Sequence, residues 1–186
     1  MKKFTLPLSV IILSAAALFM NGCILDAFNE ITQNLAIDRN FTIAGNTSGI
    51  AKQTQTFRLS DSEVYNNNAD KVTKMRYKAA AFCVSENNVP ALQGDIILTL
   101  KTQTGLVLFT KTMSGFKANE YLGVKAKNLD LTQAEIDAIN AYLSNSNLFS
   151  TLTFVTDLEV RNVTPSNTNV LMKCFVSLAM EMTFEP

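Results

Sequence analysis

The strongest structural signal in this chain of 186 residues is a period-two alternation over residues 170–184. Every second side chain there is apolar, and the set comprises Val170, Met172, Cys174, Val176, Leu178, Met180 and Met182. Successive side chains of a β-strand point to opposite faces of a sheet, whereas a helix repeats every 3.6 residues. The pattern therefore predicts a long strand with one buried face, which requires a sheet to hold it.

Weaker strand patterns precede this segment. In residues 72–84, alternation predicts one buried face made of Met75, Tyr77, Ala79, Ala81 and Cys83. The polar loop 102–105 ends in glycine and predicts a hairpin between its flanking apolar runs. The full set of predicted strands before residue 170 is 54–58, 72–84, 96–101, 106–112, 151–161 and, more weakly, 120–125.

Two short helices are predicted between the strands, and both begin with a capping box. Ser60 with Glu63 would start the first, and Thr132 with Glu135 would start the second, which continues to about Ser144. Many alternating strands with few helices favour a mainly β protein. We expect an antiparallel β-sandwich, immunoglobulin-like in the broad sense, with two short helices.

Composition limits the chemistry available to the chain. It contains neither His nor Trp, so it lacks the usual neutral-pH acid–base group, the commonest metal ligand and the strongest aromatic platform. No nucleophile elbow, phosphate loop, zinc-binding HExxH or dinucleotide motif is found. The 16 basic side chains are balanced by 16 acidic ones, which predicts no nucleic-acid partner. We expect no cofactor and a non-enzymatic protein.

The N-terminus has the form of an export signal. Lys2 and Lys3 form a positive start, and residues 4–20 are mostly apolar. Pro7 and Ser14 interrupt that run, which makes a retained membrane-spanning helix the weaker interpretation.

The end of this segment, Met20-Asn21-Gly22-Cys23, resembles a bacterial lipobox. Gly22 and Cys23 match that motif, whereas Met20 and Asn21 depart from its usual Leu and its usual Ser or Ala. The resemblance covers residues 1–23 and implies cleavage between Gly22 and Cys23. It also implies a diacylglycerol on the Cys23 sulfur, with acyl chains such as palmitate. Two or three acyl chains hold a protein firmly on a bilayer.

The resemblance implies a membrane-anchored lipoprotein of the bacterial cell envelope. Ile24 replaces the Asp that retains lipoproteins of this kind in the inner membrane, which favours the outer membrane. Residues 1–22 would be the signal peptide, 23–53 the lipidated Cys and a tether, and 54–186 the sandwich domain. This arrangement is similar to the β-sandwich domains of other cell-envelope lipoproteins.

The other two cysteines, Cys83 and Cys174, both fall in predicted strands. Export permits a disulfide between them, while two free buried thiols are the alternative. Between residues 61 and 70 the sequence gathers six carboxylate and amide side chains, but without the spacing or the glycine of a calcium loop. We interpret them as capping and turn residues and predict no metal site.

Three functions fit these features. The favoured one is a lipid-anchored envelope protein that binds or assembles with another envelope protein. The second is a carrier for a small hydrophobic ligand held between the sheets, suggested by the Met- and Phe-rich buried faces. The third is a hydrolase that uses two carboxylates, which would have to lie about 5–10 Å apart in a cleft.

Overall fold

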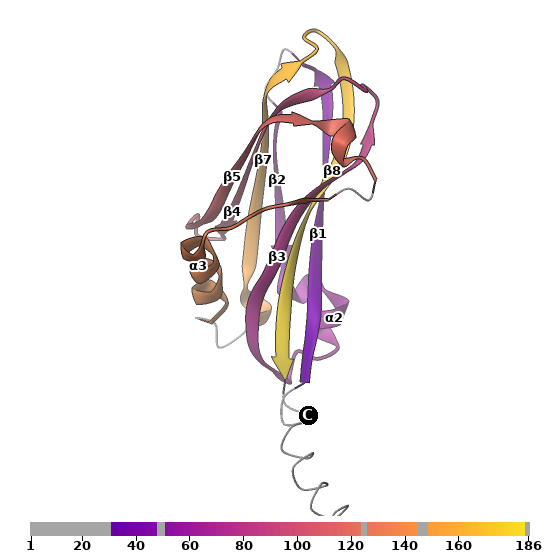
Figure 1. Cartoon of the computed structure of the whole chain (residues 1–186). Helices are drawn as coiled ribbons and strands as arrows, with labels where there is room; N and C mark the ends of the chain where they lie inside the picture. The colour runs from indigo at the N-terminus through magenta and orange to yellow at the C-terminus, as the bar shows by residue number, and fades with distance from the viewer. Residues whose placement is uncertain (1–30, 48–50, 124–125, 145–148, 185–186) are drawn as a thin grey trace, which may run out of the picture.

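The computed structural model describes residues 31–47, 51–123, 126–144 and 149–184. These residues form two four-stranded antiparallel sheets packed face to face (Figure 1). The strands are β1 Ile31–Asn46, β2 Ala51–Arg58, β3 Val72–Asn87, β4 Gln93–Thr102, β5 Val107–Lys117, β6 Lys127–Asn128, β7 Thr153–Thr164 and β8 Asn169–Phe184. The helical segments are η1 Leu59–Asp61, α2 Glu63–Asn66, η2 Ala118–Tyr121, α3 Gln133–Ser144 and η3 Phe149–Thr151.

The predicted antiparallel β-sandwich is confirmed, and the order of its strands specifies the topology. The first sheet runs β1-β8-β3-β6 and the second β2-β7-β4-β5. Apart from the β4–β5 hairpin, each strand is followed in the chain by a strand of the opposite sheet. This double Greek-key arrangement is that of an eight-stranded jelly roll, and differs from the immunoglobulin sheets, which join strands ABED and CFG.

The core lies between the sheets and follows the alternation of the sequence. In β8 the predicted apolar face is buried along its whole length, from Val170 to Met182. From the second sheet, Leu98 of β4 and Leu158 of β7 are fully buried against it. The Met residues of the sequence pattern are therefore packing residues of a single hydrophobic core.

The prediction of a tether over residues 23–53 is wrong for residues 31–46 and for the start of β2. Residues 31–46 form the edge strand β1, which pairs with β8 along its full length. The inward face of β1 carries Leu35, Ile37, Phe41 and Ile43 with Arg39 in their midst. That arginine breaks the apolar alternation, and so conceals the strand in the sequence. The sandwich thus begins no later than residue 31.

Strand β3 is present as predicted, but its buried face changes partway. The register with β8 shifts between Tyr77 and Ala79, which marks a β-bulge. Met75 lies inward before the bulge, whereas Ala80, Phe82 and Val84 lie inward after it. The prediction that Ala79, Ala81 and Cys83 share the buried core face is therefore wrong, because one extra residue reverses the faces.

Both predicted helices form. Thr132 and Glu135 make the predicted capping box of α3, since Glu135 Oε2 accepts from the Thr132 amide at 2.7 Å. The first helix, α2, is capped by Ser62 instead of Ser60. The weak strand predicted at 120–125 is wrong in its described part, where η2 extends to Tyr121.

Both ends of the described chain lie at one end of the sandwich. Ile31 and Phe184 are register partners, and the other end holds the β7–β8 connection (Figure 1). We call these the proximal and distal ends. At about 3.3 Å per residue, the 16 residues of β1 span about 50 Å between them. Among the described residues, no helix is long and apolar enough to cross a bilayer.

Candidate functional site

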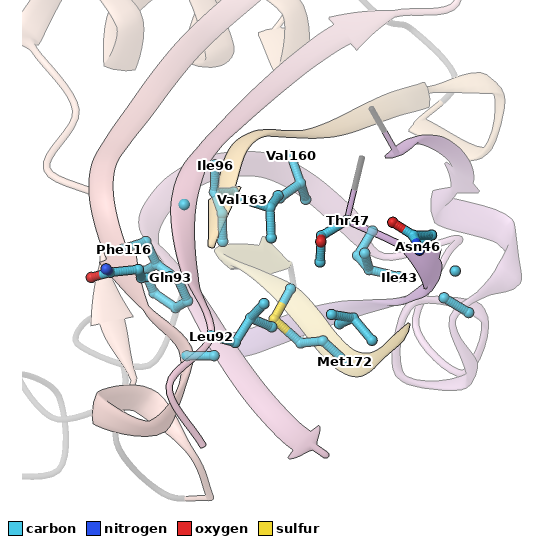
Figure 2. Close-up of a pocket in the computed structure, with 15 residues that line it drawn as sticks. Ile43, Asn46, Thr47, Leu92, Gln93, Ile96, Phe116, Val160, Val163 and Met172 are labelled. Carbon is cyan, nitrogen blue, oxygen red and sulfur yellow. The ribbon is translucent and has the colours of Figure 1, made fainter. Parts of the chain in front are cut away.

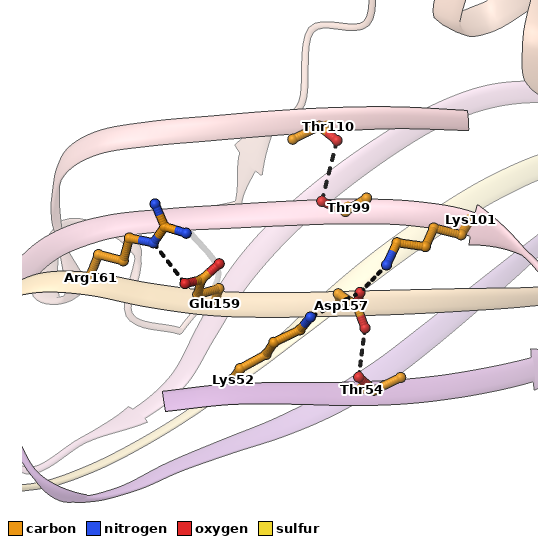
Figure 3. A network of polar contacts seen from close by, with 8 residues as sticks. All are labelled: Lys52, Thr54, Thr99, Lys101, Thr110, Asp157, Glu159 and Arg161. Atoms are coloured by element: carbon orange, nitrogen blue, oxygen red, sulfur yellow. Dashed lines mark hydrogen bonds and ion pairs between the residues drawn. The ribbon is translucent and has the colours of Figure 1, made fainter. Parts of the chain in front are cut away.

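A network of polar side chains lies on the outer face of the second sheet, around Asp157 of β7 (Figure 3). Strand register places Thr54, Asp157, Thr99 and Thr110 in one row across all four strands. Thr54 Oγ1 donates to Asp157 Oδ1 at 2.6 Å, and Lys101 Nζ donates to Asp157 Oδ2. Asp157 is 8% exposed, so its neighbours cover it almost completely.

The surroundings of Asp157 shift its pKa in opposite directions. Burial alone would raise the pKa of Asp157, but bonds from Lys101 and Thr54 and the charges of Lys101 and Lys52 outweigh burial. The pKa of Asp157 therefore lies below its usual value. Two residues along, Arg161 donates to Glu159 at 2.7 Å and likewise lowers the pKa of Glu159.

This carboxylate pair does not suit hydrolysis. A general acid in a glycosidase needs a raised pKa, whereas Asp157 and Glu159 both have lowered ones. Their oxygens are also engaged by neighbouring side chains on a sheet face rather than in a cleft. Because Asp157 bonds to side chains of β2 and β4, its geometry is that of a clamp across the sheet.

An apolar cleft opens at the distal end of the sandwich (Figure 2). Ile43 and Met172 of the first sheet face Ile96 and Val160 of the second, and Phe116 closes one side. Its volume is about 40 Å³, whereas pockets for small ligands measure about 300–1,000 Å³. A cleft of this volume can seat one apolar side chain.

A second, smaller hollow of about 20 Å³ lies deeper between the sheets, beside Arg39. The Arg39 guanidinium stacks over the Phe57 ring at 4.4 Å, and its Nη1 donates to the Asp38 carbonyl at 3.0 Å. Its Nε is buried and has no hydrogen-bond partner in the described part of the chain. Burial lowers the pKa of Arg39, although the negative charges of Asp61 and Asp38 act to raise it. A hollow of this size accommodates about one water molecule.

The candidate disulfide between Cys83 and Cys174 is not formed, and both thiols are free. The two residues lie on neighbouring strands, but on opposite faces of the sheet, because Cys83 is paired with Phe175 and Cys174 with Val84. The β3 bulge is the cause of this placement. Burial raises the pKa of the Cys174 thiol to about 12, and burial and the Asp38 charge raise the pKa of Cys83. Protonated thiols are poor nucleophiles.

The oxygen-rich segment 61–70 has the capping and turn roles predicted for it. Asp61 accepts from the Arg58 amide, and Asn66 and Asn68 donate to backbone carbonyls of Ser60 and Val64. Within the described ranges, no group of three or more His, Cys, Asp or Glu could hold a metal. Gly22 and Cys23 lie outside the described residues, so the lipidation site stays a prediction.

No protein-family model matches the chain, and no curated protein matches it. Solved structures that match include the decameric BFDV capsid protein, which is 12% identical with a TM-score of 0.41 over 82% of this chain and 99% of that one. Turnip yellow mosaic virus matches at 9% identity and a TM-score of 0.38, over 83% of each chain. Latent PorU from Porphyromonas gingivalis matches at 14% identity and 0.34, over 84% of this chain and 13% of that one. Similarities this distant give no basis for a functional conclusion.

Proposed function

We propose that this protein is a lipid-anchored, non-enzymatic binding or assembly module of the bacterial cell envelope, held on a membrane through Cys23. The observation that supports it is the position of the first strand. From Cys23 to Ile31, where β1 begins, there are eight Cα–Cα steps, which span at most about 29 Å when fully extended. A lipid at Cys23 would therefore keep the proximal end of the sandwich close to the bilayer.

The same geometry supports a binding role for the distal end. It lies about 50 Å from the proximal end, counted along β1, and it carries the apolar cleft. An anchored sandwich would present that end away from the lipid, where another envelope component can reach it. By sorting rules that the lipobox resemblance implies, Ile24 favours the outer membrane as the destination.

The alternatives receive less support from the geometry. A carrier needs a cavity of about 300 Å³ or more, whereas the apolar cleft and the hollow beside Arg39 measure about 40 and 20 Å³. A hydrolase needs a carboxyl group with a raised pKa, and Asp157 and Glu159 both have lowered ones.

The test is Cys23→Ser in the full chain, with cells grown on labelled palmitate. We expect wild-type protein to take up the label and the variant to take up none. Fractionation alone is a weaker readout, since an uncleaved signal peptide could itself hold the variant on the membrane. Cys83→Ser is the matched control and should be labelled like wild type, because Cys83 is a covered thiol in the middle of a strand. Equal labelling of Cys23→Ser and wild type would disprove the anchor.

A further inference from the structure

A polar groove of about 280 Å³ is lined by residues of β5, by Glu120 and Tyr121 of η2 and by Lys127 of β6. It is larger than either apolar hollow and approaches the size of small-ligand pockets. The charged and aromatic residues among those that line it are Phe116, Lys117, Glu120, Tyr121 and Lys127. Phe116 lines both this groove and the apolar cleft, so the two hollows adjoin in the distal half of the sandwich.

The groove exists because one sheet edge is short. Strand β6 has two residues and pairs with β3 at Ala81 and Phe82 alone. Helix α3 covers an earlier part of β3, where Asn140 Oδ1 accepts from the Tyr77 amide at 2.8 Å. Beyond β6, the side of the sandwich next to β5 is covered by η2 instead of a further strand.

Three aromatic rings lead from the core into this groove. Phe82 is fully buried and meets Phe116 edge to face, with ring centroids 5.2 Å apart. Phe116 in turn stacks on Tyr121 at 4.8 Å with an interplanar angle of 15°. Tyr121 is half-buried and lines the groove, so its ring is held in place by packing while part of it stays accessible.

Among the described residues that line the groove, the charged side chains of Lys117, Glu120 and Lys127 sum to +1. Lys117 and Glu120 form an ion pair at 3.2 Å, which leaves the Lys127 ammonium without an acidic partner among the described residues. Register pairs Lys127 with the inward-facing Phe82, so its side chain lies on the face turned toward the second sheet.

We propose that this groove binds a saccharide unit bearing an acidic group. The sugar ring would lie against Tyr121, and the carboxylate or phosphate would meet Lys127. The groove favours this class because it combines one accessible, fixed aromatic ring with one unpaired cation. The inference deepens the binding role proposed above, and rests on it for the place where such a sugar would be met.

The test is calorimetric titration of the full-length protein in detergent micelles, with saturation-transfer NMR on the same samples. Glucuronic acid is the probe, and glucose and acetate are its neutral and ring-free counterparts. We expect saturable binding of glucuronic acid, about tenfold weaker binding of glucose and of acetate, and transfer of saturation to the sugar ring protons.

Variants locate the binding. Lys127→Met and Tyr121→Leu should each weaken glucuronic acid binding about tenfold, whereas Lys127→Arg should keep most of it. Lys74→Met is the matched control, since Lys74 is an exposed lysine on the outer face of the first sheet. If Tyr121→Leu fails to unfold cooperatively on heating, the two Lys127 variants still decide the question, because Lys127 is exposed.

Each other outcome overturns the inference. Absence of saturable glucuronic acid binding would show that the groove is not a binding site for this sugar. Equal binding of acetate would show that the groove recognises the negative charge and not the sugar ring. Equal binding of glucose, or an unchanged affinity in Lys127→Met, removes the acidic group from the recognition. Palmitate labelling of the same wild-type preparation separates the two proposals, since a labelled protein that binds no sugar refutes the groove and leaves the anchor intact.

Discussion

The two lateral sides of the sandwich, where the sheets leave a gap between their edges, are closed by different means. On one side the edge strands β1 and β2 lie opposite each other. The Gln53 side chain accepts from the Thr42 amide at 3.0 Å and donates to the Thr42 carbonyl, as a paired backbone residue would. Arg39 stacks over Phe57 on the same side. Side chains of the strands themselves close this gap.

The other side is closed by a helix in one half and left as a groove in the other. Ile139 and Leu143 of α3 are fully buried in the common core. The helix is fastened at its start by an ion pair of 2.6 Å between Lys111 and Glu135. Near its end, the Tyr142 hydroxyl donates to the Thr153 carbonyl and accepts from the Thr153 amide.

The difference follows from strand length. Opposite β2 stands the sixteen-residue strand β1, which forms one edge of the first sheet, whereas opposite β5 the edge strand β6 has two residues. A long edge needs few additional contacts, while a short one leaves part of β3 to be covered by another element. The helix side should therefore depend on buried apolar area, and the β1/β2 side on a few polar contacts.

Ile139→Ala should have the largest effect on stability, because it removes a fully buried side chain from α3. We expect a loss of about 2–4 kcal/mol in the free energy of unfolding, measured by urea denaturation. Asp137→Ala, at an exposed position of the same helix, is the control and should change it by less than about 0.5 kcal/mol. A loss below 1 kcal/mol for Ile139→Ala would mean that α3 does not contribute to the core as its burial indicates.

Glu135→Gln tests the polar fastening of the same helix. Burial alone would raise the pKa of Glu135, but bonds from Lys111 and Thr132 and the Lys111 charge outweigh it and lower that pKa. We expect a loss of about 1–2 kcal/mol at pH 7.

The sign of the pH dependence follows from the lowered pKa. The contribution of Glu135 is complete above its unfolded-state value, near pH 4.5, and is lost as the pH falls through the lower folded-state value. The stability gap between wild type and Glu135→Gln should therefore shrink below pH 4 in urea titrations. The control Asp137→Asn changes an exposed carboxylate of α3 and should show a small gap. A gap that widens in acid would contradict the assignment.

Much of this architecture could be predicted from the sequence because alternation reports burial directly. The pattern over 170–184 corresponds to β8 almost residue for residue, and Thr132 with Glu135 predicted the start of α3. Strand β1 was not predicted, because Arg39 occupies an inward position, where its charge is tolerated beside Phe57 at the sandwich edge. Gln33 also occupies an inward position, so two polar residues interrupt the alternation of this sixteen-residue strand.

The sites were harder to predict than the strands. The bulge near Lys78 carries no sequence signature, yet it reversed the face of Cys83 and removed the disulfide. The groove joins residues of β5, η2 and β6 that alternation does not connect, since topology alone brings Lys127 near Thr112. Strand patterns record which face is buried, and they do not record which edges meet.

Gln53→Ala should have the smallest effect on stability and the most specific one. It removes both hydrogen bonds to Thr42. The free energy of unfolding should fall by only about 0.5–1.5 kcal/mol, because the freed Thr42 amide and carbonyl can bond to water instead. Its second effect is to free the edge of β1, and a free edge can pair with another strand. We expect concentration-dependent self-association in analytical ultracentrifugation. Gln55→Ala, two residues along the same face of β2, is the matched control and should stay unassociated. If both variants behave alike, side-chain pairing does not protect this edge, and the contrast between the two sides of the sandwich loses its basis.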